Sequence, residues 1–578
     1  MQNQSHNNPG AFIDFAKTAE SVSATTKRNE KAALVGQYLA ALDDADLRLA
    51  ARFFAGQIFP LWDQRTTNIG WAALLTAITA VLDISREELT ARAVALGDLG
   101  DVAHEVFRLS DKVKDRAPDL ALGEVAAAFD EIAATAGSKA KTAMLAALLA
   151  RAAPLEAKYI VKLLSGDLRI GLKEGSVEDA IAKLTSVAVG EVQWANMLTG
   201  DIGETALLAR RGALEQARMR LFHPIKFMLA TPAADLADVE RQMPTQFFVE
   251  DKFDGIRAQA HISPAIETDP DAHGVVVDGV RVALFSRTLD EITESFPDLV
   301  GSLAAIAAHS GEGSSTVVLD GEIVPFRDGQ ILPFLDLQKR LGRKTLPDEL
   351  LKSVPAGYMA FDILYGGGRV LIGEPLEARR SLLDELNMAS GQVQRARSRI
   401  VEGTGELDDE FAAARARGNE GLMVKNPASA YKPGRRGREW LKIKRAVDTL
   451  DVVVTAVEVG NGRRNKLLSD YTFAVKASET DLTLLNVGKA YSGLTDAELA
   501  EMSEWFRAHT IKEFAQGKVR IVEPKIVIEV TFDLVQKSNR HKSGYALRFP
   551  RIVRLRPDKN PQDIDTLEAV KGIAERKG

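Results

Sequence analysis

One short segment of the sequence carries a lysine in a setting that suits covalent chemistry. Residues 250–257 read EDKFDGIR, with Lys252 directly after an apolar run and an Asp-Gly pair two residues further on. Because Asp-Gly favours a tight turn, we expect Lys252 to end a strand beside that turn. A lysine amine is a nucleophile only when it is neutral, which burial or neighbouring cations promote by lowering its pKa. A hairpin turn with surface charges is the alternative, and the segment alone does not exclude it.

Two familiar phosphate-binding patterns are missing from the sequence. No Gly-x-x-x-x-Gly-Lys-Ser/Thr occurs, and the nearest fragment, Gly488-Lys489-Ala490, lacks the hydroxyl residue and the first glycine. A complete Gly-x-Gly-x-x-Gly is also missing, because Gly460-x-Gly462 is followed by Asn465. Any nucleotide chemistry at Lys252 must therefore use another arrangement of groups.

Charged residues also stand within strand-like segments further along the chain. Lys442 and Lys444 are two residues apart, so on a strand both side chains point to one face. If the fold brought this face beside Lys252, the two cations would neutralise phosphates and lower the pKa of Lys252 by repulsion between like charges. Glu322 and Glu420 are expected at strand positions that are flanked by apolar runs, 323–324 and 422–424. The alternatives are a solvated strand face for the lysines and salt bridges to those lysines for the glutamates.

The elements that must position these residues differ along the chain. Up to about residue 225 the sequence is rich in Ala, Leu and Glu, with apolar residues three or four apart in 32–42, 124–134, 141–150 and 177–184. Ser138 and Ser176 are expected to cap two of these helices. No repeat of constant period is present, which favours a compact bundle over a solenoid. We predict an all-helical domain over residues 1–225.

Short β-branched and aromatic runs replace the helical pattern after residue 225. They occupy 247–249, 275–277, 280–285, 316–319, 358–364, 422–424 and 440–443. Asp278-Gly279 between two of the runs predicts a type I′ hairpin, and 377–386 has a helical pattern. These features predict an α+β domain built on antiparallel sheets over residues 226–446.

A third pattern follows residue 446. Strand-like runs at 451–459, 471–475, 482–487 and 526–534 surround one helix at 496–509. A helix between the third and fourth strands is typical of a small OB-fold β-barrel, which we predict for residues 447–578. The final segment, 563–578, has the pattern of a short terminal helix.

Composition limits the class of protein. With 46% hydrophobic and 27% charged residues, the chain is typical of a soluble globular protein. It contains no cysteine, which excludes disulfides, thiolate zinc sites and cysteine nucleophiles. The polar first ten residues do not resemble a secretory signal, and the apolar stretch at 71–82 is too short to span a bilayer. We therefore expect a cytoplasmic protein.

Local clusters of basic residues point to a polyanionic partner, although the net charge is −6. Between residues 425 and 445 only Glu439 opposes the basic residues, and between 542 and 559 only Asp558 does. Such clusters suit contacts with phosphates, whose strength falls steeply with salt. The two clusters consist of Lys425, Lys432, Arg435, Arg436, Arg438, Lys442, Lys444 and Arg445, and of Lys542, Arg548, Arg551, Arg554, Arg556 and Lys559.

With these residues in view, the sequence resembles the ATP-dependent DNA ligases, within the superfamily of covalent lysine nucleotidyltransferases. The resemblance covers about residues 12–559 and rests on ordered short motifs. The helical region matches at 25–31, 166–171 and 174–180. The loop 460–470 departs from the family, which often has a more glycine-rich stretch, so its DNA contacts stay open. The later motifs are KFDG (252–255), FSR (285–287), LDGEI (319–323), FDIL (361–364), EGLMVK (420–425), WLKIK (440–444) and RFPR (548–551).

The resemblance implies a role for each matching residue. Lys252 would be the catalytic nucleophile, and Glu322 and Glu420 would bind the metal. The residues expected to bind ATP are Glu250, Arg257, Arg287, Glu322, Phe361, Lys442, Lys444 and Arg548, with Phe361 against the adenine ring. The residues expected to bind DNA are Lys27, Arg28, Arg169, Arg287 and Arg551.

The family also implies a reaction, cofactors and partners. The enzyme would seal nicks between a 3′-hydroxyl and a 5′-phosphate in duplex DNA, through a lysyl-AMP and then a DNA-adenylate, releasing pyrophosphate and AMP. Its cofactors would be ATP and Mg²⁺, or another divalent cation such as Mn²⁺. We expect a monomer that encircles nicked DNA with its three domains, in the prokaryotic nucleoid. Replication, repair and end joining all stay open as its role.

Two rivals share part of this evidence. An RNA ligase or capping guanylyltransferase uses the same lysine chemistry, but the helical region and the RFPR motif favour DNA. A non-catalytic DNA-binding scaffold would keep the fold, although every expected catalytic residue is present here. An NAD-dependent ligase is disfavoured, because its four-cysteine zinc element cannot form in a chain without cysteine.

Overall fold

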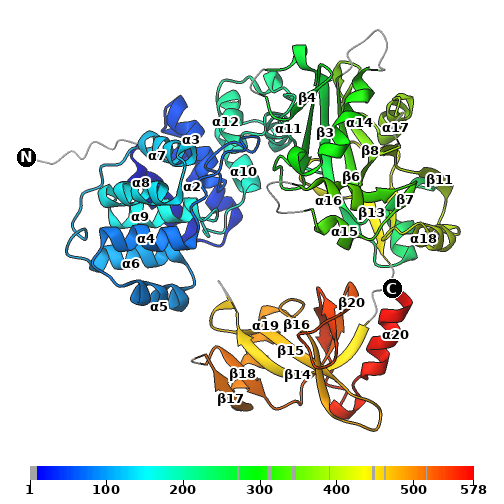
Figure 1. Cartoon of the computed structure of the whole chain (residues 1–578). Helices are drawn as coiled ribbons and strands as arrows, with labels where there is room; N and C mark the ends of the chain where they lie inside the picture. Colours follow the sequence, from blue (N-terminus) through cyan, green and yellow to red (C-terminus); the bar gives the residue numbers. More distant parts are fainter. Residues whose placement is uncertain are drawn as a thin grey trace, which may run out of the picture. The chain divides into compact units, whose positions relative to one another are not determined.

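The computed structural model describes residues 10–269, 272–308, 316–340, 346–388, 391–444, 449–460, 464–515 and 517–577 (Figure 1). The chain divides into two compact units. The first comprises Met1–Val81 and Ser110–Lys444, and the second comprises Leu82–Leu109 and Arg445–Gly578. The domain limits 1–225, 226–446 and 447–578 stay predictions, and the limit at 446 lies outside the described residues.

The N-terminal part is helical, as predicted. Phe15 lies near its centre, with its ring centroid 4.7 Å from that of Phe54 and 6.0 Å from that of Tyr159. The caps at Ser138 and Ser176 were predicted wrongly. Gly137 precedes the first of these helices with a φ of 87°, and Ser176 lies inside the second. The helices are α1 (Phe12–Ala24), α2 (Arg28–Ala40), α3 (Asp44–Phe54), α4 (Trp71–Val81), α5 (Arg86–Leu96), α6 (Leu99–Leu109), α7 (Leu122–Ala134), α8 (Ser138–Arg151), α9 (Pro154–Leu164), α10 (Glu174–Thr185), α11 (Val189–Thr199) and α12 (Ile202–Arg210), of which α5 and α6 belong to the second unit.

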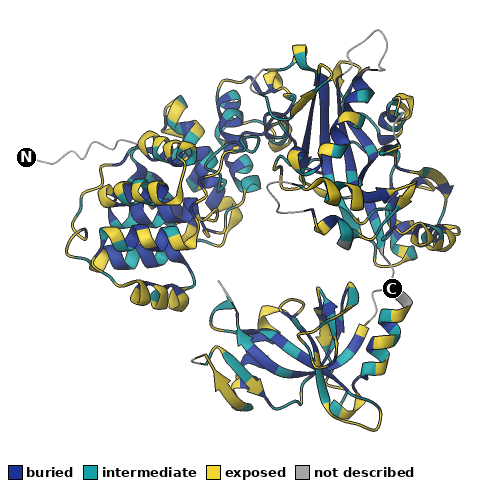
Figure 2. Cartoon of the chain, in the orientation of Figure 1, coloured by how far each residue is buried: buried dark blue, intermediate teal, exposed yellow. Residues whose placement is uncertain are grey.

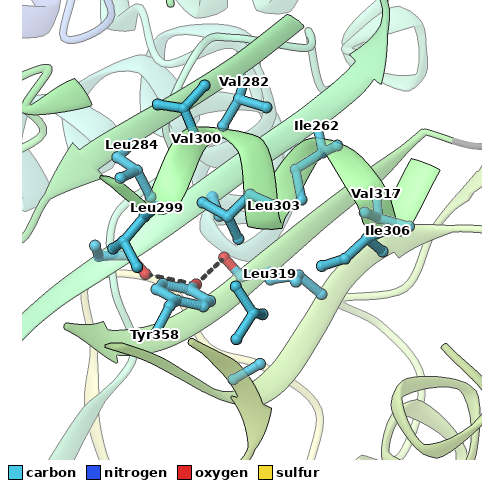
Figure 3. Packing of buried hydrophobic residues seen from close by; sticks show 14 of the residues in the cluster. Ile262, Val282, Leu284, Leu299, Val300, Leu303, Ile306, Val317, Leu319 and Tyr358 are labelled. Carbon is cyan, nitrogen blue, oxygen red and sulfur yellow. Dashed lines mark hydrogen bonds between the residues drawn. The ribbon is translucent and has the colours of Figure 1, made fainter. Parts of the chain in front are cut away.

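The larger sheet of the first unit has the strand order β10-β8-β6-β3-β5-β4. Two short strands extend it, β7 paired with β6 and β9 paired with β8. Helix α14 (Pro297–Ala308) packs its apolar residues onto one face (Figure 3). The hydroxyl of buried Tyr358 donates to the carbonyls of Ala258 and Leu319 at 3.0 and 3.2 Å. The strands are β3 (Ile256–Pro264), β4 (Val275–Val277), β5 (Val280–Ser286), β6 (Val317–Arg327), β7 (Gln330–Ile331), β8 (Ala356–Gly366), β9 (Arg369–Val370) and β10 (Val393–Arg395).

A five-stranded sheet carries the other half of this α+β region, in the order β1-β13-β12-β2-β11. Its strands are β1 (Leu229–Pro232), β2 (Gln246–Lys252), β11 (Ser398–Glu402), β12 (Gly421–Lys425) and β13 (Arg436–Lys444). Helices α13 (Leu236–Gln242) and α18 (Leu407–Ala416) help to bury one face. The sheets are mainly antiparallel, as predicted, although β1 pairs with β13, and β10 with β8, in parallel. Short helices α15 (Phe334–Gln338) and α16 (Asp348–Ser353), and the longer α17 (Leu376–Glu385), complete the region.

The C-terminal part is built on a seven-stranded antiparallel sheet around β14 (Thr449–Val459). One edge of β14 pairs with β19 along residues 449–453 and with β18 along 456–458, and its pairing with β15 has a register shift between Val454 and Ala456. As predicted, a helix follows the third strand. No strand pair among the described residues closes this OB-like sheet completely. The elements are β15 (Leu468–Lys476), β16 (Leu484–Ala490), α19 (Asp496–Ala508), β17 (Thr510–Phe514), β18 (Val519–Val522), β19 (Val527–Thr531), β20 (Leu534–Lys537), β21 (Tyr545–Arg548), β22 (Arg551–Leu555) and α20 (Leu567–Lys577).

The central strands of the sheets are buried along most of their length and are mostly dark blue in Figure 2. In β2 and β12, Phe247, Val249, Leu422 and Val424 face the apolar cluster beneath the five-stranded sheet. The residues between them point to the opposite face, because side chains alternate along a strand. That opposite face carries the chemistry described next. Across the described residues, no helix is both long and apolar enough to span a membrane.

Candidate active site

Lys252 is the last residue of β2, and the turn 253–255 leads from it into β3. The turn lies close against β6, since a Cβ added to Gly255 would stand 2.3 Å from the carbonyl oxygen of Ile323 and 2.8 Å from Cγ of Glu322. The glycine of the motif is therefore needed for a close approach between two strands. This approach brings the end of β2 beside the middle of β6, which belongs to the other sheet.

The Lys252 side chain is largely enclosed, with 20% of its surface exposed. Burial lowers the pKa of its amine, and the positive charges of Arg257 and Arg287 act in the same direction. The carboxylates of Glu322 and Asp254 oppose them. The depressed pKa expected for a nucleophilic lysine is thus present, with burial as its largest cause. The additional effect expected from Lys442 and Lys444 stays a prediction.

Two carboxyl groups accompany Lys252. Its Nζ donates a hydrogen bond to Oε2 of Glu420, and the backbone N–H of Glu420 donates to the Lys252 carbonyl at 2.7 Å. Glu322 stands on β6 opposite Arg257 of β3. Burial raises the pKa of the Glu322 carboxyl to about 7, while the charges of Lys252 and Arg257 act to lower it. A lysine and two acids from three separate segments therefore form one cluster.

The cluster opens into a cavity of about 170 Å³. This volume is smaller than the roughly 300–1,000 Å³ of typical ligand clefts, so the cavity encloses only part of a nucleotide. Seven residues predicted for the site line it, namely Glu250, Lys252, Arg257, Arg287, Glu322, Phe361 and Lys442. Glu420 is not part of this lining, but it accepts a hydrogen bond from Lys252, which is. Lys444 ends β13 opposite Gly421, and its side chain lies outside the described part of the chain.

Arg257 spans the cavity wall and is held by several partners. Its guanidinium donates to both oxygens of Asp320 at 3.1 and 2.7 Å, and to the carbonyl of Met228 at 2.6 Å. The Tyr431 hydroxyl donates to the same Asp320 at 2.6 Å. The guanidinium carbon lies 5.3 Å from the centroid of the Phe361 ring. Most donors of Arg257 are thus used within the protein, and its contact with ATP stays a prediction.

The cavity also contains residues that the sequence did not single out for roles there. Met423, Lys425 and Trp440 line it from β12 and β13, and Arg436 begins β13. Strand alternation could have identified the first two from the sequence, because Met423 and Lys425 alternate with the buried residues Leu422 and Val424. Trp440 and Lys442 likewise share one face of β13.

A second polar cluster supports the turn before Glu420. Asp251 accepts from Nε and Nη2 of Arg417 at 2.9 and 2.6 Å, and from Nδ2 of Asn419 at 3.0 Å. Asp251 is only 8% exposed. The residue before Lys252 therefore binds the residues just before Glu420, which fixes the two ends of the charged cluster relative to each other.

Three segments matched in the helical region come together although they are far apart in sequence. Arg28 donates from Nε and Nη2 to Asp179 at 2.9 and 2.6 Å. Lys31, also on α2, is buried and donates to the carbonyl of Ile170, next to Arg169. Arg169 has a φ of 52°, and Lys27 is exposed at the start of α2. The DNA contacts of Lys27, Arg28 and Arg169 stay predictions.

The loop after β5 that carries Arg287 is held by the helical region. Gln64 accepts from the N–H of Glu291 at 2.8 Å and donates to the carbonyl of Leu289 at 2.9 Å. Nearby, the rings of Trp62 and His223 stack with centroids 4.4 Å apart. Arg287 itself is exposed beside the cavity, which suits either predicted role.

The remaining predicted residues belong to the second unit and are not among the residues that line the cavity. The Arg548 guanidinium lies 5.0 Å from the centroid of the Phe549 ring, and Arg551 pairs with Asp533 at 3.5 Å. Both roles stay predictions. In the loop 460–470, residues 461–463 are outside the described part, and Asn465 donates to the carbonyl of Ala95 at 2.9 Å.

No group of three or more His, Cys, Asp or Glu suited to a metal ion occurs within the described ranges. The two carboxylates predicted to bind a metal are Glu322, which lines the cavity, and Glu420, which accepts from Lys252. Mg²⁺ commonly uses one or two carboxylates together with phosphate oxygens and water, so this donor set fits a cation that arrives with a nucleotide. A site made only of protein groups is not required for such binding.

Comparisons with known proteins agree along the chain. Residues 11–182 match the family model described as DNA ligase N terminus. Residues 227–444 match the ATP dependent DNA ligase domain, and residues 464–559 match the ATP dependent DNA ligase C terminal region. The three matches follow one another in the order of the three sequence patterns.

Similar full-length proteins also exist. The chain is 47% identical to a "Probable DNA ligase" of Koribacter versatilis, over 97% of this chain and 96% of that protein. It is 34% identical to a "DNA ligase" of Archaeoglobus fulgidus, over 97% and 98% of the two chains. A solved structure described as "Pmar-Lig_Pre." aligns with 94% of this chain and 99% of its own, at a TM-score of 0.59 and 16% identity, which supports the fold alone.

Proposed function

Because the chain belongs to the family of ATP-dependent DNA ligases, we propose that Lys252 carries AMP while the enzyme seals nicks in duplex DNA. The observation that supports Lys252 is its position, enclosed beside Glu322 and Glu420 at the mouth of a cavity. A nucleophilic lysine needs a lowered pKa, and this lysine has one.

In the first step, Nζ of neutral Lys252 attacks the α-phosphorus of ATP. A P–N bond forms, the bond from that phosphorus to the pyrophosphate oxygen breaks, and the nitrogen releases a proton. The hydrogen bond from Nζ to Glu420 supports this carboxylate as the acceptor of the proton. Phosphoryl transfer depends mainly on positioning and charge neutralisation, so Lys442, Lys444, Arg287 and Arg548 would surround the phosphates.

Two further transfers complete the reaction. An oxygen of the 5′-phosphate of DNA attacks the phosphorus of lysyl-AMP, the P–N bond breaks, and a DNA-adenylate forms. The 3′-hydroxyl oxygen then attacks the 5′-phosphate, AMP leaves, and a phosphodiester bond joins the strands. The amine of Lys252 is regenerated at the second step, so one residue serves each cycle.

Glu322 and Glu420 would hold a divalent cation, Mg²⁺ or Mn²⁺, together with phosphate oxygens. When bound, the cation supplies positive charge that neutralises the phosphates. The raised pKa of Glu322 supports this assignment, since a buried carboxyl group beside a cavity is stabilised in its charged form by a nearby cation. Phe361 and Glu250 would contact the adenine, and Arg257 the ribose.

The DNA would lie against basic residues of the helical region and of both later parts, which include Lys27, Arg28, Arg169, Arg287 and Arg551. We propose that a single chain encircles the nicked duplex with its three domains, in the prokaryotic nucleoid. The clustering of segments 25–31, 166–171 and 174–180 supports a continuous contact surface in the helical region.

A chase experiment tests this function. The protein is incubated with α-labelled ATP and a divalent cation, freed of unbound nucleotide, and then mixed with DNA that carries one nick. We expect label to move from protein to DNA and then to free AMP as the nick closes. Label that stays on the protein in the presence of nicked DNA, but leaves it with nicked RNA, would point to the RNA ligase rival.

A further inference from the structure

A lysine and a glutamate form a buried ion pair in the cavity wall, and the proposed chemistry at Lys252 does not account for the lysine. Nζ of Lys425 lies 2.5 Å from Oε2 of Glu250, and the side chains are 1% and 3% exposed. Both residues line the cavity. Two charges withdrawn from water to this extent are costly unless each compensates the other.

The strands place the pair beside two aromatic rings. Lys425 stands opposite Trp440 across β12 and β13, and Glu250 stands opposite Met423 across β2 and β12. The Lys425 ammonium lies 4.2 Å from the centroid of the Trp440 ring and 4.6 Å from that of Phe361. These distances are within the range of cation–π attraction, so the ammonium is stabilised in its charged form.

An ionised carboxylate can only accept hydrogen bonds, whereas a protonated carboxyl group can also donate one. Adenine carries an amino group at position 6, which donates, and guanine carries an oxygen there, which accepts. The Glu250 carboxylate, paired with Lys425, therefore suits the adenine edge and repels the guanine edge.

We propose that Lys425 sets the choice of adenine over guanine, because its ion pair holds the Glu250 carboxylate in place as a hydrogen-bond acceptor in the wall of the cavity. The proposal rests on nucleotide binding at this site as described under the proposed function. Lys425 is a positioning residue here, because it acts on the base through Glu250. Its removal leaves the buried Glu250 carboxyl group without its counter-charge and without the partner that holds it towards the base.

The test compares the binding of ATP and GTP by the full chain, in variants that also carry Lys252→Ala so that no covalent product forms. Calorimetry gives a dissociation constant for each nucleotide. We expect Lys425→Met to reduce the preference for ATP by about tenfold or more, because a site built on one hydrogen bond loses most of its discrimination with it. Lys425→Arg keeps a cation and should keep the preference.

Two further variants separate selectivity from folding. Lys141→Met removes another buried lysine, which donates to the carbonyl of Thr67, far along the chain from the cavity residues, and should leave the ATP preference unchanged. Glu250→Gln should lose the preference, and adding Lys425→Met to it should cause little further loss, since both changes act through one group.

Equal weakening of ATP and GTP binding in Lys425→Met would overturn the proposal and leave Lys425 a structural role. An unchanged preference in Glu250→Gln would overturn it as well. A different result would refute the proposed function alone. In that case the protein with Lys252 intact forms no covalent adduct with ATP, although the binding preferences are as expected.

Discussion

Lys252 and Glu322 share a cavity in which burial acts on the two side chains in opposite senses. It lowers the pKa of the amine and raises that of the carboxyl group to about 7. Both effects reduce the charged forms, and each residue partly restores the charge of the other. The amine is thereby made a better nucleophile, and the carboxyl group is left ready to bind a cation.

The raised pKa of Glu322 predicts a pH-dependent effect on stability. The folded pKa is above the ordinary value of 4.5, so the folded state holds the proton more tightly and wild-type stability falls as pH rises from about 4.5 to 7. Glu322→Gln lacks this effect. We expect the variant to gain up to about 3 kcal/mol over wild type between about pH 5 and pH 8, measured by denaturant unfolding without divalent cations.

Glu156 is a matched control for this prediction. Burial raises the pKa of its carboxyl group to about 7 as well, and it lies in the helical region, where its side chain accepts from the N–H of Ala153. Glu156→Gln should show a similar pH trend in stability but unchanged adduct formation with ATP. A stability difference for Glu322→Gln that does not vary with pH would contradict the burial argument.

At the scale of elements, the site depends on where two sheets meet. The end of β2 lies close to the middle of β6 because Gly255 has no side chain, and the face of β2, β12 and β13 opposite the apolar cluster forms the cavity wall. Strand alternation along 420–425 and 440–444 is visible in the sequence. For this reason the face of Lys442 was predictable.

Other features could not be predicted because they depend on distant segments. The environment of Lys425 is made by Phe361 and Trp440, which come from two other strands. The parallel pairing of β1 with β13 joins residues about two hundred positions apart. The wrong helix caps have a local reason, since Gly137 with its positive φ begins α8 without a side-chain cap.

Gly255→Ala tests the contact between the sheets. The added Cβ would meet backbone at 2.3 Å, so the turn and Lys252 must shift away from β6. We expect a loss of about 1–3 kcal/mol in stability and a marked loss of adduct formation. Gly301→Ala is the control, because its Cβ meets nothing within 4 Å on α14 and should be neutral or stabilising. Normal labelling by Gly255→Ala would show that the close approach is unimportant.

Asp251 tests how the turn before Glu420 is positioned. Asp251→Asn keeps the shape but weakens the paired hydrogen bonds to Arg417. We expect a loss of about 1–3 kcal/mol in stability and slower adduct formation, because a hydrogen bond between charged groups is lost. Arg417→Ala should have a similar effect, and the double variant should be little worse than either single one. Strictly additive effects would mean that the two residues act separately.

At the scale of the whole molecule, a chain with a net charge of −6 carries its basic residues in clusters. Segments of the helical region that lie far apart in sequence bring Lys27, Arg28 and Arg169 onto neighbouring elements. The second unit adds Arg548 and Arg551. Binding to DNA by such residues releases counterions, whereas nucleotide binding in a mostly enclosed cavity depends less on added salt.

Salt should therefore separate the two activities. We expect the affinity for nicked DNA to fall by about 10³-fold or more between 50 and 200 mM salt, if six or more phosphates are contacted. Adduct formation with ATP should change much less over the same range. Fluorescence anisotropy of labelled nicked DNA and gel-based labelling measure the two. A flat salt dependence of DNA binding would contradict the basic clusters as the contact surface.

The central claim is that Lys252 is the residue that becomes covalently attached to AMP. It is tested most directly by incubating wild type and Lys252→Ala with α-labelled ATP and Mg²⁺, and measuring label on the denatured protein. Lys489→Ala, which alters an exposed lysine paired with Glu458 in the second unit, is the control and should label normally. The account predicts strong labelling of wild type and none of Lys252→Ala, whereas persistent labelling of Lys252→Ala would contradict it.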